Sequence, residues 1–355
     1  MNHKERVLKT LLKEPVDRVP FFYWGVPEFS EKMMKHLGLS DRDQLMDYLD
    51  VDFRWVEPVY VGPGLIDASG KKKKDIWGVG YTKVKNEGFE YWDVTDFPLK
   101  GITEPEYLDS YPWPSLSWFD FQSLDAQIHK YRDFAIMTAP GYSSPGLFRI
   151  AQRMIGKEDF ENVMMLHPKF FKALCDHITN FYTQFVESFF AVAGNRVDFI
   201  RIADDFGAPS GLSITPEIWE KYCKPAIESF TSVPLKLGVK FYMHSCGAVR
   251  KLIPELVTAG ADVLDPIQTR AWGMEPTGLK KDFGGMISFC GALDEELLLR
   301  QSTPAGVKEG VKELLDHMAP GGGFILGPSH KLKVETPVEN VIAMYEAARE
   351  WKFDL

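Results

Sequence analysis

The sequence has few cysteines, no long apolar run and no excess of basic residues. Its four cysteines are spread over 355 residues, which argues against a small disulfide-stapled fold and predicts reduced thiols. No segment approaches the roughly 20 consecutive apolar residues of a membrane-spanning helix, and the first residues lack the apolar core of a signal peptide. The net charge of −9 disfavours nucleic acid and anionic membranes as partners. We therefore expect a cytoplasmic protein that binds neither nucleic acid nor a membrane.

The chain does contain enough apolar material for a large core. Hydrophobic residues make up 45% and charged residues 26%, the balance of a folded globular protein. Eight β-rich runs recur, each followed by a helical pattern or a long excursion. The expected strands are Val19–Trp24, Phe53–Tyr60, Phe134–Ala139, Val197–Asp204, Lys240–Ser245, Asp262–Ile267, Met286–Cys290 and Phe324–Pro328. This alternation predicts a parallel α/β fold.

The connections favour a closed (β/α)8 TIM barrel over an open doubly wound sheet. An open nucleotide-binding sheet carries a glycine-rich phosphate loop after its first strand, and Trp24–Glu28 holds no such loop. Barrels of this class commonly reach the length of this chain as one unit. We expect residues 1–355 to form a single barrel domain.

Helices are marked by an apolar stripe and by capping pairs. Apolar residues step by three and four from Phe170 to Phe189, which predicts a helix that faces a sheet. Three Thr-Pro pairs each place a capping hydroxyl before a proline at the first helical position. These pairs are Thr215-Pro216, Thr303-Pro304 and Thr336-Pro337. Thr336 and Glu339 also match a capping box.

The region 61–132 after the second strand is too long for an ordinary loop. Within it, Trp77–Thr82 and Phe89–Asp93 alternate around Asn86-Glu87-Gly88, which predicts a β-hairpin. Long loops on a barrel carry function more often than packing. We expect this insertion to form a lid over the catalytic mouth.

Polar and metal-capable residues gather where the expected strands end. In a barrel, the carboxyl ends of the strands form the catalytic face. The residues at these ends are Tyr23, Trp24, Glu57, Tyr142, Asp204, Asp205, His244, Cys246, Asp265, Gln268, Cys290, Ser329 and His330. Packing does not require such a set, so the pattern indicates an enzyme over a binding module.

His244-Ser245-Cys246-Gly247 is the most specific motif. Residues two apart on a strand point the same way, so an imidazole and a thiolate can converge on one ion, and zinc accepts that mixed set. Two ligands are too few, and His330 and Cys290 are both candidates for the third. The alternative is a buried histidine beside an inert cysteine.

Asp204 and Asp205 follow a strongly apolar run. Adjacent acids at a strand end can orient a substrate or transfer a proton, although one of them could instead cap a helix. Glu57 is equally compatible with a structural ion pair. Tyr23 and Trp24 suit either the core or the wall of a substrate site.

Together these motifs resemble the uroporphyrinogen decarboxylase superfamily over nearly the whole chain. The resemblance rests on Arg18-Val19-Pro20, Asp204-Asp205, His244-Ser245-Cys246-Gly247, Gly291-Ala292-Leu293-Asp294, Gly321–Leu326 and Thr336–Asn340. True decarboxylases of the superfamily have an arginine-rich stretch after the first strand that grips the substrate acetates. Here Phe21–Val26 contains no basic residue. The chain is therefore more similar to the other branch, the zinc-dependent, corrinoid-linked methyltransferases.

That resemblance implies a ligand set and a reaction. The branch uses a His-x-Cys pair and a later cysteine, and the later position falls on His330, six residues before Thr336. It thus implies zinc held by His244, Cys246 and His330, with Gln268 or Asp265 as a fourth group. Two histidines and one thiolate leave the ion electrophilic. Such an ion suits a methyl ether whose oxygen must leave.

The implied reaction moves a methyl group from a small-molecule methyl ether, aromatic by expectation, to cob(I)alamin on a partner corrinoid protein. Asp204 or Asp205 would orient the substrate or manage its proton. The substrate-binding residues would be Tyr23, Trp24, Glu57, Tyr142 and Gln268. Methyl transfer from a methylcorrinoid to a thiol or pterin, and a metal-free lyase of the decarboxylase type, remain alternatives. The sequence leaves a homodimer open.

Overall fold

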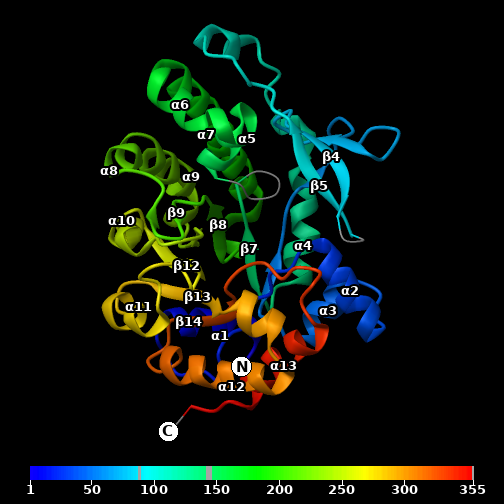
Figure 1. Cartoon of the computed structure of the whole chain (residues 1–355), viewed down its shortest axis with the longest axis vertical. Coiled ribbons are helices and arrows are strands. Elements are labelled where there is room, and N and C mark those ends of the chain that lie inside the picture. Colours follow the sequence, from blue (N-terminus) through cyan, green and yellow to red (C-terminus); the bar gives the residue numbers. More distant parts are fainter. Residues whose placement is uncertain (87–88, 141–145, 354–355) are drawn as a thin grey trace.

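The computed structural model describes residues 1–86, 89–140 and 146–353. Its centre is a seven-stranded parallel sheet in the order β1-β7-β8-β11-β12-β13-β14 that curls upon itself (Figure 1). The strands are β1 Phe53–Trp55, β7 Ala135–Thr138, β8 Phe199–Ala203, β11 Lys240–His244, β12 Ala261–Ile267, β13 Ser288–Leu293 and β14 Phe324–Pro328. The predicted parallel α/β barrel architecture is confirmed.

The segment around Phe21 closes the curled sheet. The Phe22 amide donates to Leu326 O at 2.8 Å on β14, and the Asp52 amide, beside β1, donates to Phe21 O at 3.0 Å. This segment forms one bridge, not the regular strand expected at Val19–Trp24. Pro20 has no N–H, so it contributes only an acceptor to the ladder.

Two other strand predictions need correction. The second strand stops at Trp55; Val59–Tyr60 forms β2, which pairs antiparallel with β6 (Phe119–Asp120). Pro58 separates the two pieces and cannot donate to a ladder. The seventh strand begins at Ser288, not Met286, and continues to Leu293 because its pairing with β14 persists through Leu293. Cys290 therefore lies within a strand, not at its end.

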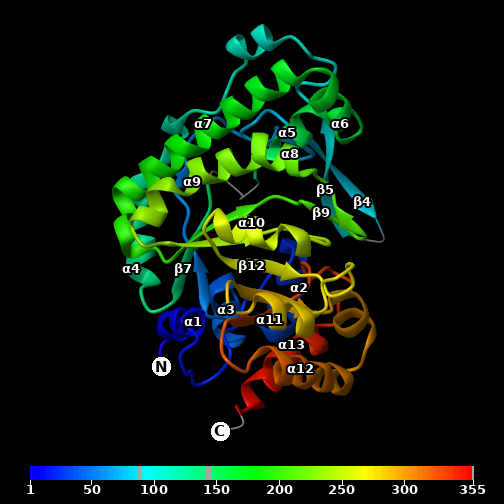
Figure 2. The same cartoon turned by 90° about the vertical axis from the view of Figure 1, so that its left-hand side faces the viewer.

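Helices surround the curled sheet (Figure 2). They are α1 His3–Leu11, α2 Pro27–Leu37, α3 Arg42–Tyr48, α4 Leu124–Lys130, α5 Leu147–Ile155, α6 Lys157–Leu166, α7 Pro168–Ala193, α8 Pro216–Ile218, α9 Lys224–Lys236, α10 Ile253–Thr258, α11 Pro276–Phe283, α12 Pro304–Met318 and α13 Val338–Glu350. The predicted stripe of α7 is buried throughout. No helix in the described parts of the chain is long and apolar enough to cross a membrane.

Two of the three predicted helix caps are confirmed. Thr215 and Thr303 accept hydrogen bonds from the third amides of their helices. Thr336 does not cap α13: the capping position is Pro337, and the buried Thr336 hydroxyl has no hydrogen-bond partner among the described residues. Pro337 takes an extended ψ of 131°. The helix therefore begins one residue later than the Thr-Pro pair suggested.

The inserted region carries a small antiparallel sheet of β3 Lys72–Lys74, β4 Gly80–Asn86 and β5 Phe89–Asp96. The turn residues Glu87 and Gly88 of the expected hairpin lie outside the described residues. Buried Trp77 attaches the insertion to α7, with its ring 5.2 Å from Phe181 and 5.3 Å from Tyr182. The lid role stays a prediction.

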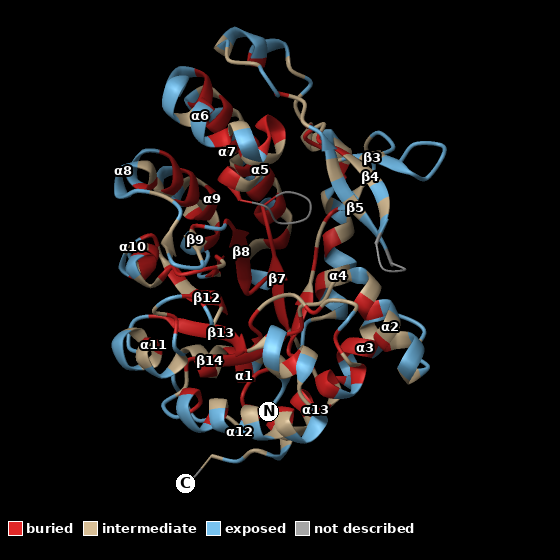
Figure 3. Ribbon diagram, viewed as in Figure 1, coloured by how far each residue is buried: buried red, intermediate tan, exposed pale blue. Residues whose placement is uncertain are grey.

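Buried residues line the strands and the inner faces of the helices (Figure 3). One cluster fills the barrel interior and includes Phe22, Phe53, Phe199, Tyr242 and Cys290. Because the interior is packed with side chains, chemistry is confined to the mouth of the barrel.

Candidate metal centre at the barrel mouth

His244 ends β11, and its ring is oriented by a buried carboxylate. Its Nδ1 donates to Asp265 Oδ2 at 2.8 Å, and the same oxygen accepts from Arg201 Nη2 at 2.9 Å. Burial opposes ionisation of Asp265, but the charge of Arg201 and the hydrogen bond from His244 hold its pKa below the usual value. Metal-bound histidines are commonly held in this way, and the arrangement leaves the other nitrogen of His244 available to a metal ion.

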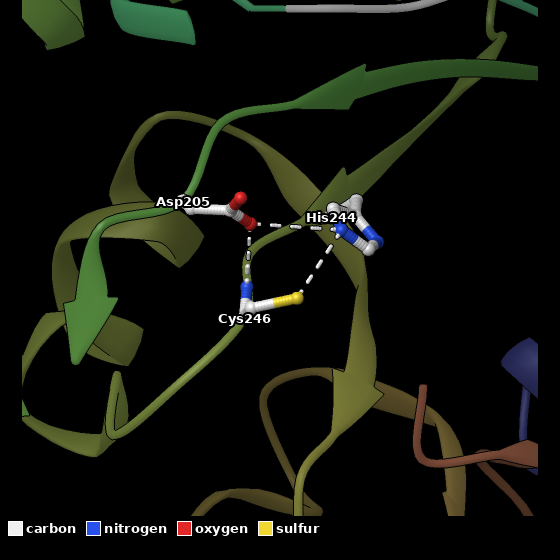
Figure 4. Close-up of side chains that lie close together, drawn as sticks. All are labelled: Asp205, His244 and Cys246. Carbon is white, nitrogen blue, oxygen red and sulfur yellow. Dashed lines mark hydrogen bonds and ion pairs between the residues drawn. The ribbon is translucent and has the colours of Figure 1, made fainter. Parts of the chain in front are cut away.

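The free nitrogen of His244 faces a thiol and a carboxylate (Figure 4). Nε2 lies 3.6 Å from Cys246 Sγ and 3.7 Å from Asp205 Oδ1. The donor atoms of Asp205, His244 and Cys246 all lie within 4.8 Å of one another, the arrangement expected of a site for a metal ion. The structure thus brings together two of the three expected ligands and adds Asp205.

The loops after β8 and β11 approach closely enough to fix this cluster. A Cβ on Gly207 would meet Cys246 O at 2.6 Å, so only glycine fits there without a shift. The Phe206 amide donates to Ser245 Oγ at 2.9 Å, and the Gly247 amide donates to Gln268 Oε1 at 2.6 Å. Gln268, expected to bind substrate, therefore also braces the turn after Cys246.

His330 does not join the cluster in the described geometry. The Trp24 ring contacts both histidines, with its centroid 4.8 Å from His244 and 5.3 Å from His330. Burial, with Lys331 and Lys333 nearby, lowers the pKa of His330 to about 4, so its imidazole is neutral and able to ligate. Cys290, the other candidate, is fully buried in the barrel interior, where burial raises its pKa.

The adjacent acids Asp204 and Asp205 point in different directions. Asp204 accepts from the amides of Phe148 at 2.8 Å and Arg149 at 2.9 Å, so it caps the start of α5. Burial raises its pKa to about 7. Asp205 faces the cluster instead, accepts from the Cys246 amide at 3.1 Å and pairs with Arg149 Nη1 at 2.7 Å. Burial opposes its ionisation, but the Arg149 and His244 charges keep its pKa below the usual value.

The cluster combines a carboxylate with a thiol and an imidazole, and the pKa of each of the three groups is shifted. Burial and the neighbouring Asp205 raise the pKa of the Cys246 thiol, while burial and Arg201 lower the pKa of His244. A divalent cation would reverse the first effect, because a coordinated thiol is deprotonated. A neutral imidazole, a thiolate and a carboxylate are a donor set that zinc accepts.

Three cavities open beside the cluster: one of about 340 Å³ is lined by Arg149 and Asp205, and the other two contain residues expected to bind substrate. The first of these two, of about 440 Å³, is lined by Cys246, Gln268, Glu295, His330 and Lys333, among others. The second, of about 490 Å³, is lined by Tyr23, Trp24, Trp55, Glu57 and Arg201, among others.

The residues expected to bind substrate do not all line the same cavity. Trp24 contacts the cluster and lines the second cavity with Glu57. Tyr23 is nearly buried, and its hydroxyl lies 2.9 Å from Ser30 Oγ; burial raises its pKa to about 12. Tyr142 lies outside the described residues.

Sequence reasoning missed Arg149, Arg201 and Glu295. Arg201 was detectable as a single charge within the apolar run Phe199–Ala203. Arg149 reaches the cluster from a helix distant in sequence, and no local pattern marks it. Glu295 follows β13, whose end was placed too early.

The sequence pattern of the uroporphyrinogen decarboxylase (URO-D) family matches residues 143–351, more than half of the chain. The chain belongs to the URO-D family. A relative, methylcobamide:CoM methyltransferase MtbA of Methanosarcina acetivorans, is 26% identical over 211 residues, which cover 59% of this chain and 57% of MtbA.

A solved structure is similar to this protein over nearly its whole length. A methyltransferase from Methanosarcina mazei superposes with a TM-score of 0.69 at 18% identity, covering 99% of each chain. This likeness establishes the shared fold. The expected superfamily membership is confirmed, and these two relatives are methyltransferases.

Proposed function

We propose that this URO-D family protein is a zinc-dependent methyltransferase that moves a methyl group from a methyl ether to cob(I)alamin on a corrinoid protein. The observation that carries the proposal is the Asp205–His244–Cys246 cluster, oriented by Asp265 and in contact with the ring of Trp24. Its relatives include methyltransferases. An aromatic methoxyl group is the expected donor because an indole ring borders the cluster.

His244, Cys246 and Asp205 would hold the zinc ion, and His330 would supply a donor from the wall of the adjoining cavity. Zinc bound there would act as a Lewis acid on the ether oxygen and stabilise the charge that develops on it. The methyl carbon would be transferred to cob(I)alamin of the partner protein, which would supply the electron pair of the new bond. The carbon–oxygen bond breaks, and its electron pair stays on the departing oxygen, which is then protonated from solvent.

The surrounding residues would orient both partners. Arg149 holds Asp205 through their ion pair, while Asp204 positions α5, from which Arg149 extends. Trp24, which contacts both His244 and His330, would provide an apolar wall for an aromatic ring. Gln268 would provide a polar contact from the first cavity, and Glu57 from the second. The first-strand segment has no basic residue to pair with several carboxylates, which are costly to desolvate alone.

The remaining expectations form part of the same proposal. Residues 1–355 would act as one domain in the cytoplasm, and a corrinoid protein would dock over the barrel mouth. Homodimer formation does not enter the mechanism.

Methyl transfer from a methylcorrinoid to a thiol is a second candidate. The observation that favours it is the resemblance to MtbA, a methylcobamide:CoM methyltransferase. A zinc site that includes a thiolate and a carboxylate is less electrophilic than one with two histidines, and such a site suits activation of a bound thiol.

A donor screen tests the proposal. Zinc-loaded protein is incubated with cob(I)alamin and a panel of methoxylated phenols, and formation of methylcob(III)alamin is followed by absorbance. We expect at least one ether to donate its methyl group. If no ether does, yet a thiol removes the methyl group from methylcob(III)alamin, the second candidate replaces the first.

A further inference from the structure

Glu295 is a buried carboxyl group without a partner, beside the proposed zinc site. Its side chain is 1% exposed, and neither carboxylate oxygen has a hydrogen-bond partner among the described residues. It follows β13 at the mouth of the barrel. Its backbone amide donates to Ser329 Oγ at 3.0 Å, which fixes the turn that carries it.

This carboxyl group lines the cavity of about 440 Å³ that also contains Cys246 and His330. Lys333 lines the same cavity, and no hydrogen bond or ion pair links its ammonium group to another described residue. The next residue, Glu296, also lines the cavity, but it is exposed and paired with Arg270 at 2.8 Å. The cavity wall thus offers one acidic and one basic group that have no hydrogen-bond or ion-pair partner among the described residues.

Folded proteins satisfy nearly all buried polar groups, because an unmet desolvation penalty destabilises the fold. Burial also raises the pKa of Glu295, although the charges of Lys333 and Arg300 oppose the shift. Buried polar groups that destabilise the fold in this way are commonly found at binding sites, where a ligand supplies the missing hydrogen-bond partner. A ligand in this cavity must therefore satisfy Glu295 and Lys333 together.

A hydroxyl group meets both requirements. It donates to a carboxylate and accepts from an ammonium group, and it carries no charge of its own. An ammonium group on the ligand would be repelled by Lys333, and a carboxylate would be repelled by an ionised Glu295. We propose that Glu295, with Lys333, selects methyl donors that carry a free hydroxyl group, so that the substrate class is methoxylated phenols rather than simple aryl ethers.

The inference rests on the proposed function, but binding tests it without methyl transfer. The probes are 2-methoxyphenol, 4-methoxyphenol and methoxybenzene, titrated into zinc-loaded protein by calorimetry. For wild-type protein we expect at least one phenol to bind ten times more tightly than methoxybenzene or better. In Glu295→Leu that preference should fall below threefold, because a site built around a hydroxyl discriminates through the polar groups left unpaired.

Matched variants separate recognition from folding. Glu309→Leu changes an exposed acid of α12 that does not line the cavity and should keep the wild-type preference, whereas Lys333→Met should reduce it. Glu295→Leu should leave the melting temperature of the free protein unchanged or raise it, because it removes an uncompensated group. A lower melting temperature together with an unchanged preference would show that Glu295 is structural and would overturn the inference.

A fourth probe, 4-methoxybenzoate, tests the competing ligand chemistry. If it binds more tightly than either phenol and depends on Glu295, a protonated Glu295 recognises a carboxylate, and the hydroxyl assignment is wrong. Failure of the proposed function has a different signature: Glu295-dependent binding of the phenols with no methylcob(III)alamin formed from any of them.

Discussion

At the scale of single residues, the direction of a side chain decides its role more than its chemical type does. Asp204 and Asp205 are the same residue at adjacent positions, yet one caps α5 and the other faces His244 and Cys246. Neighbouring side chains of an extended segment point to opposite sides. The sequence could identify the pair but not which member faces the site, because that depends on where α5 lies.

The proposed ligands can be tested by metal content. His244→Ala and Cys246→Ala should each lose most bound zinc, because each removes a donor from a site with few. Cys290→Ser should retain zinc, since Cys290 is buried in the barrel interior. Inductively coupled plasma mass spectrometry of the purified proteins measures the zinc per chain. Full zinc in both alanine variants, or its loss in Cys290→Ser, would contradict the assignment.

Replacing Asp204 and Asp205 one at a time should affect different properties of the protein. Asp204→Asn should lower the free energy of unfolding by about 1 kcal/mol, the usual value of a helix cap, with zinc content unchanged. Asp205→Asn should weaken zinc binding by about 10–100-fold with a smaller effect on stability. Urea denaturation and competition with a chromophoric chelator provide the two readouts. The reverse pattern would exchange the roles of the two acids.

At the scale of elements, the loops after β8 and β11 pack backbone against backbone. This contact holds the residues of the proposed metal centre in place. The β9 strand (Gly207–Ala208) contacts the turn at Cys246 and Gly247, while Gly211 in the paired β10 strand (Gly211–Leu212) has open space around its Cα. Gly207→Ala should shift the turn, cost about 1–3 kcal/mol of stability and reduce zinc affinity. Gly211→Ala is the matched control and should retain both. Equal zinc affinity in the two variants would show that the close approach is not required.

Most elements followed from local patterns, and two of the errors in strand placement have a local cause. Apolar runs located the strands, and the stripe from Phe170 to Phe189 located α7. Proline explains the interrupted first strand and the early end of β1, because a missing N–H breaks a ladder without changing the apolar pattern. The extension of β13 past Cys290 depends on pairing with β14, which no window of the sequence reveals.

At the scale of the whole molecule, a buried ionic network closes the end of the barrel opposite the mouth. Asp52 is fully buried; it accepts from Arg6 at 2.6 Å, from Arg18 at 2.8 Å and from the Phe21 amide at 2.6 Å. It thereby ties α1 and the closing segment to the sheet. Burial alone would raise the pKa of Asp52, but His3 and the two arginines hold it below the usual value.

Asp52→Asn should lower the free energy of unfolding by about 3–5 kcal/mol at neutral pH, because it leaves buried cations uncompensated. The contribution of a carboxylate with a lowered pKa is fully present above its unfolded value of about 4 and is lost as the pH falls through its folded pKa. The difference between wild-type and variant protein should therefore shrink below about pH 4. A pH-independent difference in urea denaturation would contradict this account.

The barrel and the position of its reactive face were predictable, because strand ends and the His-x-Cys motif are local. The third metal ligand was not predictable, because Asp205 and His330 reach the mouth from strands that are distant in sequence. Family membership cannot decide between them either, since a shared fold fixes the scaffold while the site defines the chemistry.

The central claim is that zinc at this cluster activates methyl transfer from a methoxylated phenol. The most direct measurement compares one preparation of the protein in three states: as purified, stripped by a chelator, and reloaded with zinc. Each is mixed with cob(I)alamin and 2-methoxyphenol while methylcob(III)alamin is followed by absorbance. The account predicts transfer in the first state, at least a hundredfold slower transfer in the second, and recovery in the third. Equal rates in the stripped and reloaded protein would contradict it.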